Sequence, residues 1–222
     1  MNKEAKDIIE KLTVLSSETE LQKMNRIGIN TQTAFGINLT KLREIAKPYK
    51  NNHALALELW ECGVHEAKIM ATMIDNPKLV TKEQISSWSN DFYSWDICDL
   101  TCRNLFENTK YVIPLISKWT KCKRIFKKRA GFVLIARLAK VNKKISNKKF
   151  SYYLSIVEKN SSDERNLVMK SVAWALRQIG KRNNILKEEA TLTAYIIGEK
   201  KDKSSRWIAS NYFVELGIKR ND

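Results

Sequence analysis

Glycine and proline are scarce in this chain, whose 222 residues contain 7 Gly and 3 Pro. All-β folds need these residue types at many tight turns, so their scarcity argues against a protein of many short strands. No apolar run approaches the roughly 18 residues that a membrane-spanning helix needs. The first residues, Met1 to Lys6, are largely charged and unlike the apolar stretch of a secretory signal. We therefore expect a cytoplasmic protein without membrane contact.

Metal-ligating residues are also few, with 4 Cys, 2 His and no C-x-x-C pair. Cys98 and Cys102 would share one face of a helix, which is a possible start for a metal site. Small buried thiols in a reducing compartment explain the same pattern more simply. We expect neither a metal nor a cofactor.

Acidic residues are missing from one long segment. The 50 residues from Asn108 to Val157 carry 14 Lys or Arg and no Asp or Glu, whereas the rest of the chain carries 26 basic and 24 acidic residues. Nearly all of the net charge of +16 therefore lies in this segment. Apolar residues at helical spacing, such as Trp119 and Phe132, interrupt it and argue against a disordered tail. The pattern favours a nucleic-acid-binding surface over an acidic membrane or protein partner.

The apolar spacing is helical almost throughout and predicts roughly a dozen helices in a single domain, residues 1–222. The Asn76-Pro77 pair predicts the end of a helix, because the residue before proline avoids the α region. Three capping boxes predict helix starts: Ser17/Glu20, Thr81/Gln84 and Ser161/Glu164.

A weak internal repeat runs along the chain. Four segments begin with a charged residue and continue into an apolar helix of similar length, and they start at Glu66, Arg129, Lys170 and Arg206. The last three starts are 41 and 36 residues apart, which is the period of solenoids built from two-helix units. The fold class expected is thus an all-α array of stacked helix pairs.

Helical angles separate core from surface in the helix predicted over residues 163–182. Its apolar residues fall within about a 100° arc at 100° per residue, and they are Val168, Val172, Ala175, Leu176 and Ile179. Trp174 lies far outside this arc, among Lys170, Arg177 and Lys181. A tryptophan among basic residues suits contact with nucleic acid, although a neighbouring helix could instead cover it as core.

A second candidate is the helix that contains Trp95, Asp99 and Arg103, which follow one edge at intervals of four residues. An Asp99–Arg103 salt bridge would explain the spacing and contribute only about 0.2–0.5 kcal/mol. A carboxylate repels phosphate, however, so Asp99 beside Trp95 in a basic protein indicates a function. In a third helix, Arg129 could hold a phosphate by two hydrogen bonds or be one basic residue among many.

These segments resemble the bacterial AlkD family of DNA alkylation repair glycosylases, in order and over nearly the whole chain. The matching segments are Ala34-Phe-Gly-Ile37, Leu42-Arg43, Leu59 to Glu66, Trp95-Asp-Ile-Cys-Asp99, Phe126 to Phe132 and Lys170 to Lys181. The resemblance implies a right-handed, C-shaped solenoid of HEAT-like antiparallel helix pairs with a basic concave face for double-stranded DNA. It also implies a monomer that removes N3- and N7-alkylated purines while the lesion stays stacked.

The resemblance assigns roles to residues that the helical angles had singled out. It implies that Asp99 is catalytic, that Trp95 and Trp174 face the DNA beside it, and that Arg129 binds a phosphate. Their basic neighbours Lys128, Lys170, Arg177, Lys181 and Arg103 would fix the DNA backbone.

One departure concerns the stretch from Met24 to Ile29, where relatives place an aromatic residue that packs on DNA and this chain offers Ile27. We expect no histidine near the site, because a cationic alkylated base leaves without protonation. Some relatives lack glycosylase activity. The alternatives are therefore a non-catalytic protein that binds bent or branched DNA and, further off, a scaffold for an acidic protein partner.

Overall fold

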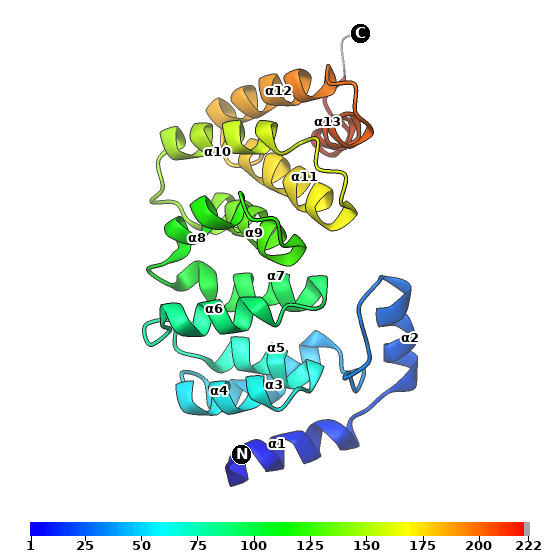
Figure 1. Cartoon of the computed structure of the whole chain (residues 1–222), viewed down its shortest axis with the longest axis vertical. Helices are drawn as coiled ribbons and strands as arrows, with labels where there is room; N and C mark the ends of the chain where they lie inside the picture. The colour runs from blue at the N-terminus through cyan, green and yellow to red at the C-terminus, as the bar shows by residue number, and fades with distance from the viewer. Residues whose placement is uncertain (220–222) are drawn as a thin grey trace. The chain divides into compact units, whose positions relative to one another are not determined.

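The computed structural model describes residues 1–219, and over that range its regular structure is helical, without a strand (Figure 1). The all-α fold predicted from the apolar spacing is confirmed. The chain divides into two compact units, of which the first spans Met1–Tyr111 and the second begins at Val112. The expectation of a single domain stays a prediction.

The first unit has two layers of helices. The neighbours α3, α5 and α7 form one layer, and α4 packs against α5 and α1 in the other. The helices of this unit are α1 (Lys3–Val14), α2 (Glu18–Arg26), α3 (Leu39–Ala46), the 3-10 turn η1 (Lys47–Tyr49), α4 (His53–Glu61), α5 (His65–Ile74), α6 (Lys82–Asn90), α7 (Trp95–Asn104) and the 3-10 turn η2 (Phe106–Asn108).

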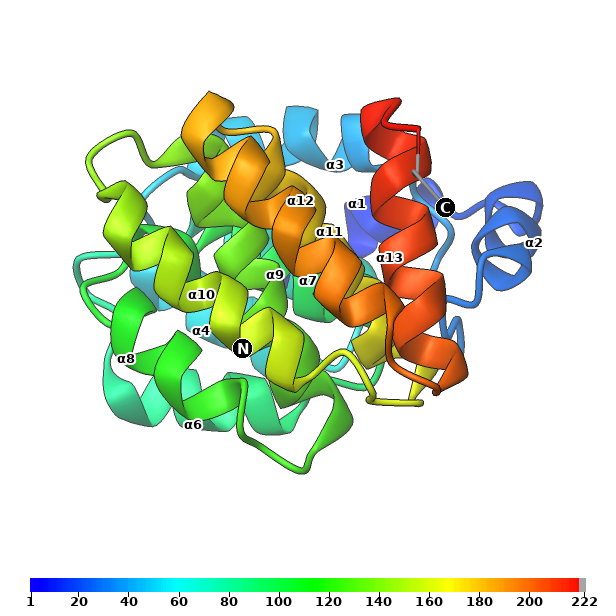
Figure 2. The same ribbon diagram turned by 90° about the horizontal axis from the view of Figure 1, so that it is seen from above.

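The second unit repeats this layering. Helices α9, α11 and α13 follow one another in one layer, and α10 lies beside α12 in the other (Figure 2). Helix α8 packs against α9. The helices of this unit are α8 (Val112–Trp119), α9 (Ile125–Val141), α10 (Asn147–Lys159), α11 (Asn166–Gly180), α12 (Asn184–Gly198) and α13 (Lys203–Leu216).

The segments that form the internal repeat all lie in the second helix of a pair. Glu66 is in α5, Arg129 in α9, Lys170 in α11 and Arg206 in α13. Each of these helices buries its apolar side between neighbouring helices. The repeat in the sequence therefore reflects one recurring structural position.

The N-cap hydrogen bond is present in two of the three predicted capping boxes, although the Gln84 side chain donates to Asp75 and does not return to the cap. Backbone N–H groups of Glu20 and Gln84 donate to the Ser17 and Thr81 hydroxyls at the starts of α2 and α6. The third prediction was wrong, because the Ser161 hydroxyl donates to the Glu158 carbonyl instead and α11 begins only at Asn166. The end predicted at Asn76-Pro77 is confirmed, since α5 stops at Ile74.

A stacked pair of tryptophans anchors the core of the first unit. The rings of Trp60 and Trp88 are parallel within 2°, with centroids 4.0 Å apart, and both residues are buried. The Trp60 indole N–H donates to Asp91 at 2.9 Å. The Lys68 ammonium lies 4.6 Å from the centroid of a Trp60 ring, adding a cation–π contact. This cluster joins α4, α5 and α6.

Candidate nucleic-acid interface

The edge of α7 carries the first group of predicted site residues. The inward side of this helix is buried at Ile97, Cys98 and Thr101, and so is Leu105 directly after it. Trp95 and Asp99 are half-buried, and Arg103 is exposed one turn further on. Because residues four apart share a helix face, the three side chains follow one edge of α7.

Trp95 is fixed by a contact with the segment that follows α2. Its indole N–H donates to the backbone carbonyl of Ile27 at 3.2 Å. The Ile27 side chain is 61% exposed beside it. Ile27, the aliphatic residue that the sequence offers in place of an aromatic one, therefore lies next to Trp95.

A buried hydrogen-bond network lies beneath the start of α7. His65 is fully buried, and its imidazole contacts Asp96 Oδ2 and the Tyr93 hydroxyl, each at 2.8 Å. Ser94 donates to the other Asp96 oxygen at 2.6 Å. The expectation of no histidine near the site was wrong, because His65 contacts a residue between Trp95 and Asp99. The sequence does not show this pair, which joins positions 31 residues apart.

The environment of Asp96 keeps its carboxylate ionised. Burial raises its pKa, but hydrogen bonds from His65 and Ser94 and the charge interaction with His65 outweigh burial, and the pKa falls below its ordinary value. Asp96 therefore acts as a fixed acceptor that holds the first turn of α7. Asp96 thereby positions the backbone of α7 that carries Trp95 and Asp99.

Glu66 holds the neighbouring segment in place. Its side chain is buried, and its two oxygens accept backbone N–H groups of Phe35, Gly36 and Ile37 at 2.9, 2.8 and 3.2 Å. Gly36 has φ +78°, and a Cβ there would lie 2.3 Å from the Ser17 carbonyl oxygen, so only glycine fits. The segment between α2 and α3 is thereby tied to α5.

In the second unit, α11 carries the next group of predicted residues. Its five predicted core residues are all fully buried, which confirms the helical-angle prediction. Trp174 is half-buried on the other side, between the exposed Lys170 and the half-buried Arg177. Arg177 donates to the Asn211 side chain, and Lys181 pairs with Glu215 at 2.7 Å. Both basic residues thus have partners on α13.

Arg129 is buried between two helices of the second unit. It is 7% exposed, and its guanidinium donates to the Leu167 carbonyl at 2.7 Å. This bond joins α9 to the start of α11. The phosphate contact of Arg129 stays a prediction.

Lys128 belongs to an ion-pair cluster that the sequence did not predict. Its ammonium lies 2.9 Å from Asp163, which also accepts from Arg165 at 2.6 Å. The charge of Lys128 is thus partly balanced within the protein. The signal in the sequence was weak, since Lys128 and Asp163 lie in separate helical segments.

The comparisons with known proteins bear on the whole chain. The model of a family described as DNA alkylation repair enzyme matches residues 8–211. The chain belongs to this family. The solved structure of a protein from a family described as related to the HEAT-like repeat DNA glycosylases, with affinity for branched DNA structures, matches at a TM-score of 0.81. The match covers 97% of both chains at 22% identity and shows the HEAT-like repeat fold. No sequence among curated proteins matches the chain.

As a member of the DNA alkylation repair family, the protein carries its predicted DNA-facing residues in two groups. Trp95, Asp99 and Arg103 share an edge of α7 in the first unit, and the others lie on α9 and α11 in the second. Within residues 1–219, no group of three or more His, Cys, Asp or Glu is placed to hold a metal ion. Over the same residues, no helix has both the length and the apolar character to cross a membrane.

The Asp163 cluster of this family member predicts a dependence of stability on pH. Hydrogen bonds from Arg165 and Lys128 hold the pKa of Asp163 well below its usual range. The ionised carboxylate therefore adds stability above its unfolded pKa of about 3.9, and this contribution is lost as pH falls through the lower folded-state pKa. We expect wild type to be more stable than Asp163→Asn at neutral pH, with the difference shrinking well below about pH 4.

Urea unfolding at stepped pH measures this difference. Asp7→Asn removes an exposed carboxylate on α1 and serves as the matched control. A difference between wild type and Asp163→Asn that stays constant across the acid range would contradict the prediction.

Proposed function

We propose that the protein is a DNA glycosylase that removes N3- and N7-alkylated purines from duplex DNA by hydrolysis of the N-glycosidic bond. The observation that carries this proposal is the position of Asp99. Its carboxylate is half-buried on the edge of α7, one turn after Trp95, in a protein of net charge +16. A carboxylate on a surface that binds a polyanion opposes binding, which supports a role for Asp99 in the reaction.

The chemistry of the lesion explains that role. An N3- or N7-alkylated purine is already cationic, so the base leaves without a proton from a general acid. Positive charge then develops on the deoxyribose, and a nearby carboxylate stabilises it. Asp99 would supply this charge and orient or deprotonate the attacking water. The buried His65 is consistent with this scheme, because it holds Asp96 and has no exposed surface from which to protonate a base.

The tryptophans and basic residues would hold the DNA during this step. Trp95 and Trp174 would offer electron-rich faces to the developing sugar cation. Arg129 and Lys128 would contact the backbone, together with Lys170, Arg177, Lys181 and Arg103. With the sugar and backbone gripped, the lesion would remain stacked and no pocket would need to fit it.

The second candidate function is the binding of branched DNA without catalysis. The observation that favours it is the structural neighbour, whose family is described as having affinity for branched DNA structures. The two functions share a fold and a basic surface. They differ in whether Asp99 is needed, because a binding protein gains nothing from a carboxylate among phosphates.

The test is the release of 7-methylguanine and 3-methyladenine from methylated duplex DNA. A glycosylase releases both bases in a time-dependent reaction that is proportional to protein concentration. No release, combined with tighter binding to a four-way junction than to duplex, would contradict the proposal and establish the branched-DNA function.

A further inference from the structure

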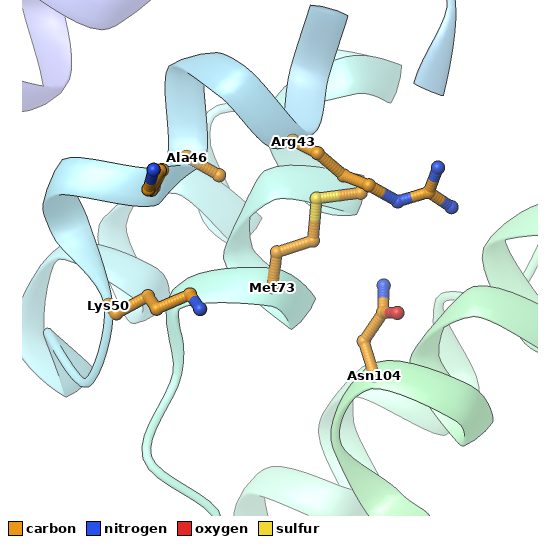
Figure 3. A pocket seen from close by; sticks show the side chains of 6 residues that line it. Arg43, Ala46, Lys50, Met73 and Asn104 are labelled. Atoms are coloured by element: carbon orange, nitrogen blue, oxygen red, sulfur yellow. The ribbon is translucent and has the colours of Figure 1, made fainter. Parts of the chain in front are cut away.

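A basic hollow lies in the first unit, away from the edge formed by Trp95 and Asp99. Its volume is about 360 Å³, and it is lined by Arg43 and Ala46 of α3, Lys47 and Lys50 of the following turn, Met73 of α5 and Asn104 at the end of α7. Figure 3 shows Arg43 and Asn104 on one side of Met73 and Lys50 on the other. Three cationic side chains therefore surround one space with an apolar floor.

The lining residues include no carboxylate. The nearest acidic residue along α3, Glu44, pairs with Lys41 at 3.1 Å. Asn104 adds a directed donor, because one hydrogen of its amide donates to the Thr72 hydroxyl at 2.9 Å and holds the amide in place. The second hydrogen of the same amide can donate into the hollow.

Helix stabilisation alone does not explain this arrangement. A basic residue at the end of α3 interacts favourably with the helix dipole, and Lys47 at the C-cap supplies that charge. Arg43 lies one turn earlier, and like charges four residues apart destabilise a helix. Within residues 1–219 no ion pair joins Arg43, Lys47 or Lys50 to an acidic residue, and an anion in the space between these cations would stabilise them.

We propose that this hollow binds a phosphate of the DNA backbone, outside the nucleotide that is held at Asp99. Asn104 follows Asp99 by five residues on α7, a rise of about 7.5 Å along the helix axis. At 100° per residue Asn104 also lies about 140° around α7 from Asp99, so the hollow is set off from the edge that carries Asp99. The site extends the proposed function, on which it rests for the identity of its ligand.

The test measures the affinity of the full chain for a short, undamaged, labelled duplex by fluorescence anisotropy, between about 50 and 200 mM salt. Arg43→Gln/Lys47→Gln/Lys50→Gln, the hollow variant, removes the three positive charges of the hollow. Lys3→Gln/Lys6→Gln/Lys11→Gln removes the same number of charges from exposed positions on α1 and is the matched control. Lys47→Arg/Lys50→Arg preserves the charge of the hollow.

The slope of log affinity against log salt is negative, and removal of one phosphate contact should reduce its magnitude by about 0.9. We expect a slope smaller by about one to two in the hollow variant, and an unchanged slope in the control and in the charge-preserving variant.

An unchanged slope in the hollow variant, or an equal decrease in the control, would overturn the proposal. The two proposals fail separately, because binding is measured on undamaged DNA. A smaller slope in the hollow variant, with no base release by wild type from methylated DNA, would support the hollow and contradict the glycosylase. Base release by wild type, with an unchanged slope in the hollow variant, would support the glycosylase and contradict the hollow. No DNA binding at all would overturn both proposals.

Discussion

Asp99→Asn is expected to release 7-methylguanine and 3-methyladenine from methylated duplex DNA at least about a hundredfold more slowly than wild type. Removal of one preoriented electrostatic contact to a transition state typically costs a factor of about 10²–10³. Asparagine keeps the size of the side chain but loses the charge that faces the developing sugar cation. Single-turnover release from excess protein measures the chemical step directly.

DNA binding by Asp99→Asn should be equal to or tighter than that of wild type, because the variant loses a negative charge facing phosphates. This separates a catalytic role from a structural one, since a misfolded variant would lose both properties. Asp7→Asn, which removes an exposed carboxylate of α1, should leave both release and binding unchanged. Release by Asp99→Asn at the rate of wild type would exclude Asp99 as the catalytic carboxylate.

Glu66→Ala is expected to have the largest effect on stability. It would leave the backbone N–H groups of Phe35, Gly36 and Ile37 without their acceptor in a largely buried place. An unsatisfied buried donor costs about 1–3 kcal/mol, so we expect a loss of about 3–5 kcal/mol in the free energy of unfolding. Urea unfolding measures this loss.

Glu66→Gln is the matched control, since it keeps one acceptor oxygen and nearly the same volume. It should lose less stability than Glu66→Ala. Hydrogen exchange of the three amides locates the effect, and their protection should fall furthest in Glu66→Ala. A loss of less than about 1 kcal/mol in Glu66→Ala would show that water replaces the carboxylate without cost.

The helical surfaces could be predicted from the sequence because they depend on local spacing. The buried face of α11, and the position of Trp174 outside that face, follow from 100° per residue, whereas the half-burial of Trp174 does not. The edge of α7 with Trp95 and Asp99 follows in the same way. The caps at Ser17 and Thr81 are also local, since each joins residues three positions apart.

The contacts that hold these surfaces in place could not be predicted in this way. His65 and Asp96 belong to different helices, and periodicity within one helix does not show which partner another helix supplies. Glu66 seemed to be the charged start of an apolar helix, yet its carboxylate is buried and binds the backbone. The Ser161/Glu164 box has the right spacing, but Ser161 contacts Ser205 at 2.9 Å instead. In each case a distant residue outweighed the local pattern.

The contacts of the segment after α2 affect the order in which the chain folds. Trp95 donates to Ile27, and Asn30 donates to Ser94, so these bonds close loops of 68 and 64 residues. Packing between successive helices closes far shorter loops, and the entropy cost of closure grows with loop length. The helix pairs should therefore form first, and the surroundings of Trp95 should be completed late. The same surface should be among the first to open in local unfolding. A newly made chain should therefore form its helices before its DNA-binding surface, and a warmed chain should lose that surface before its helices.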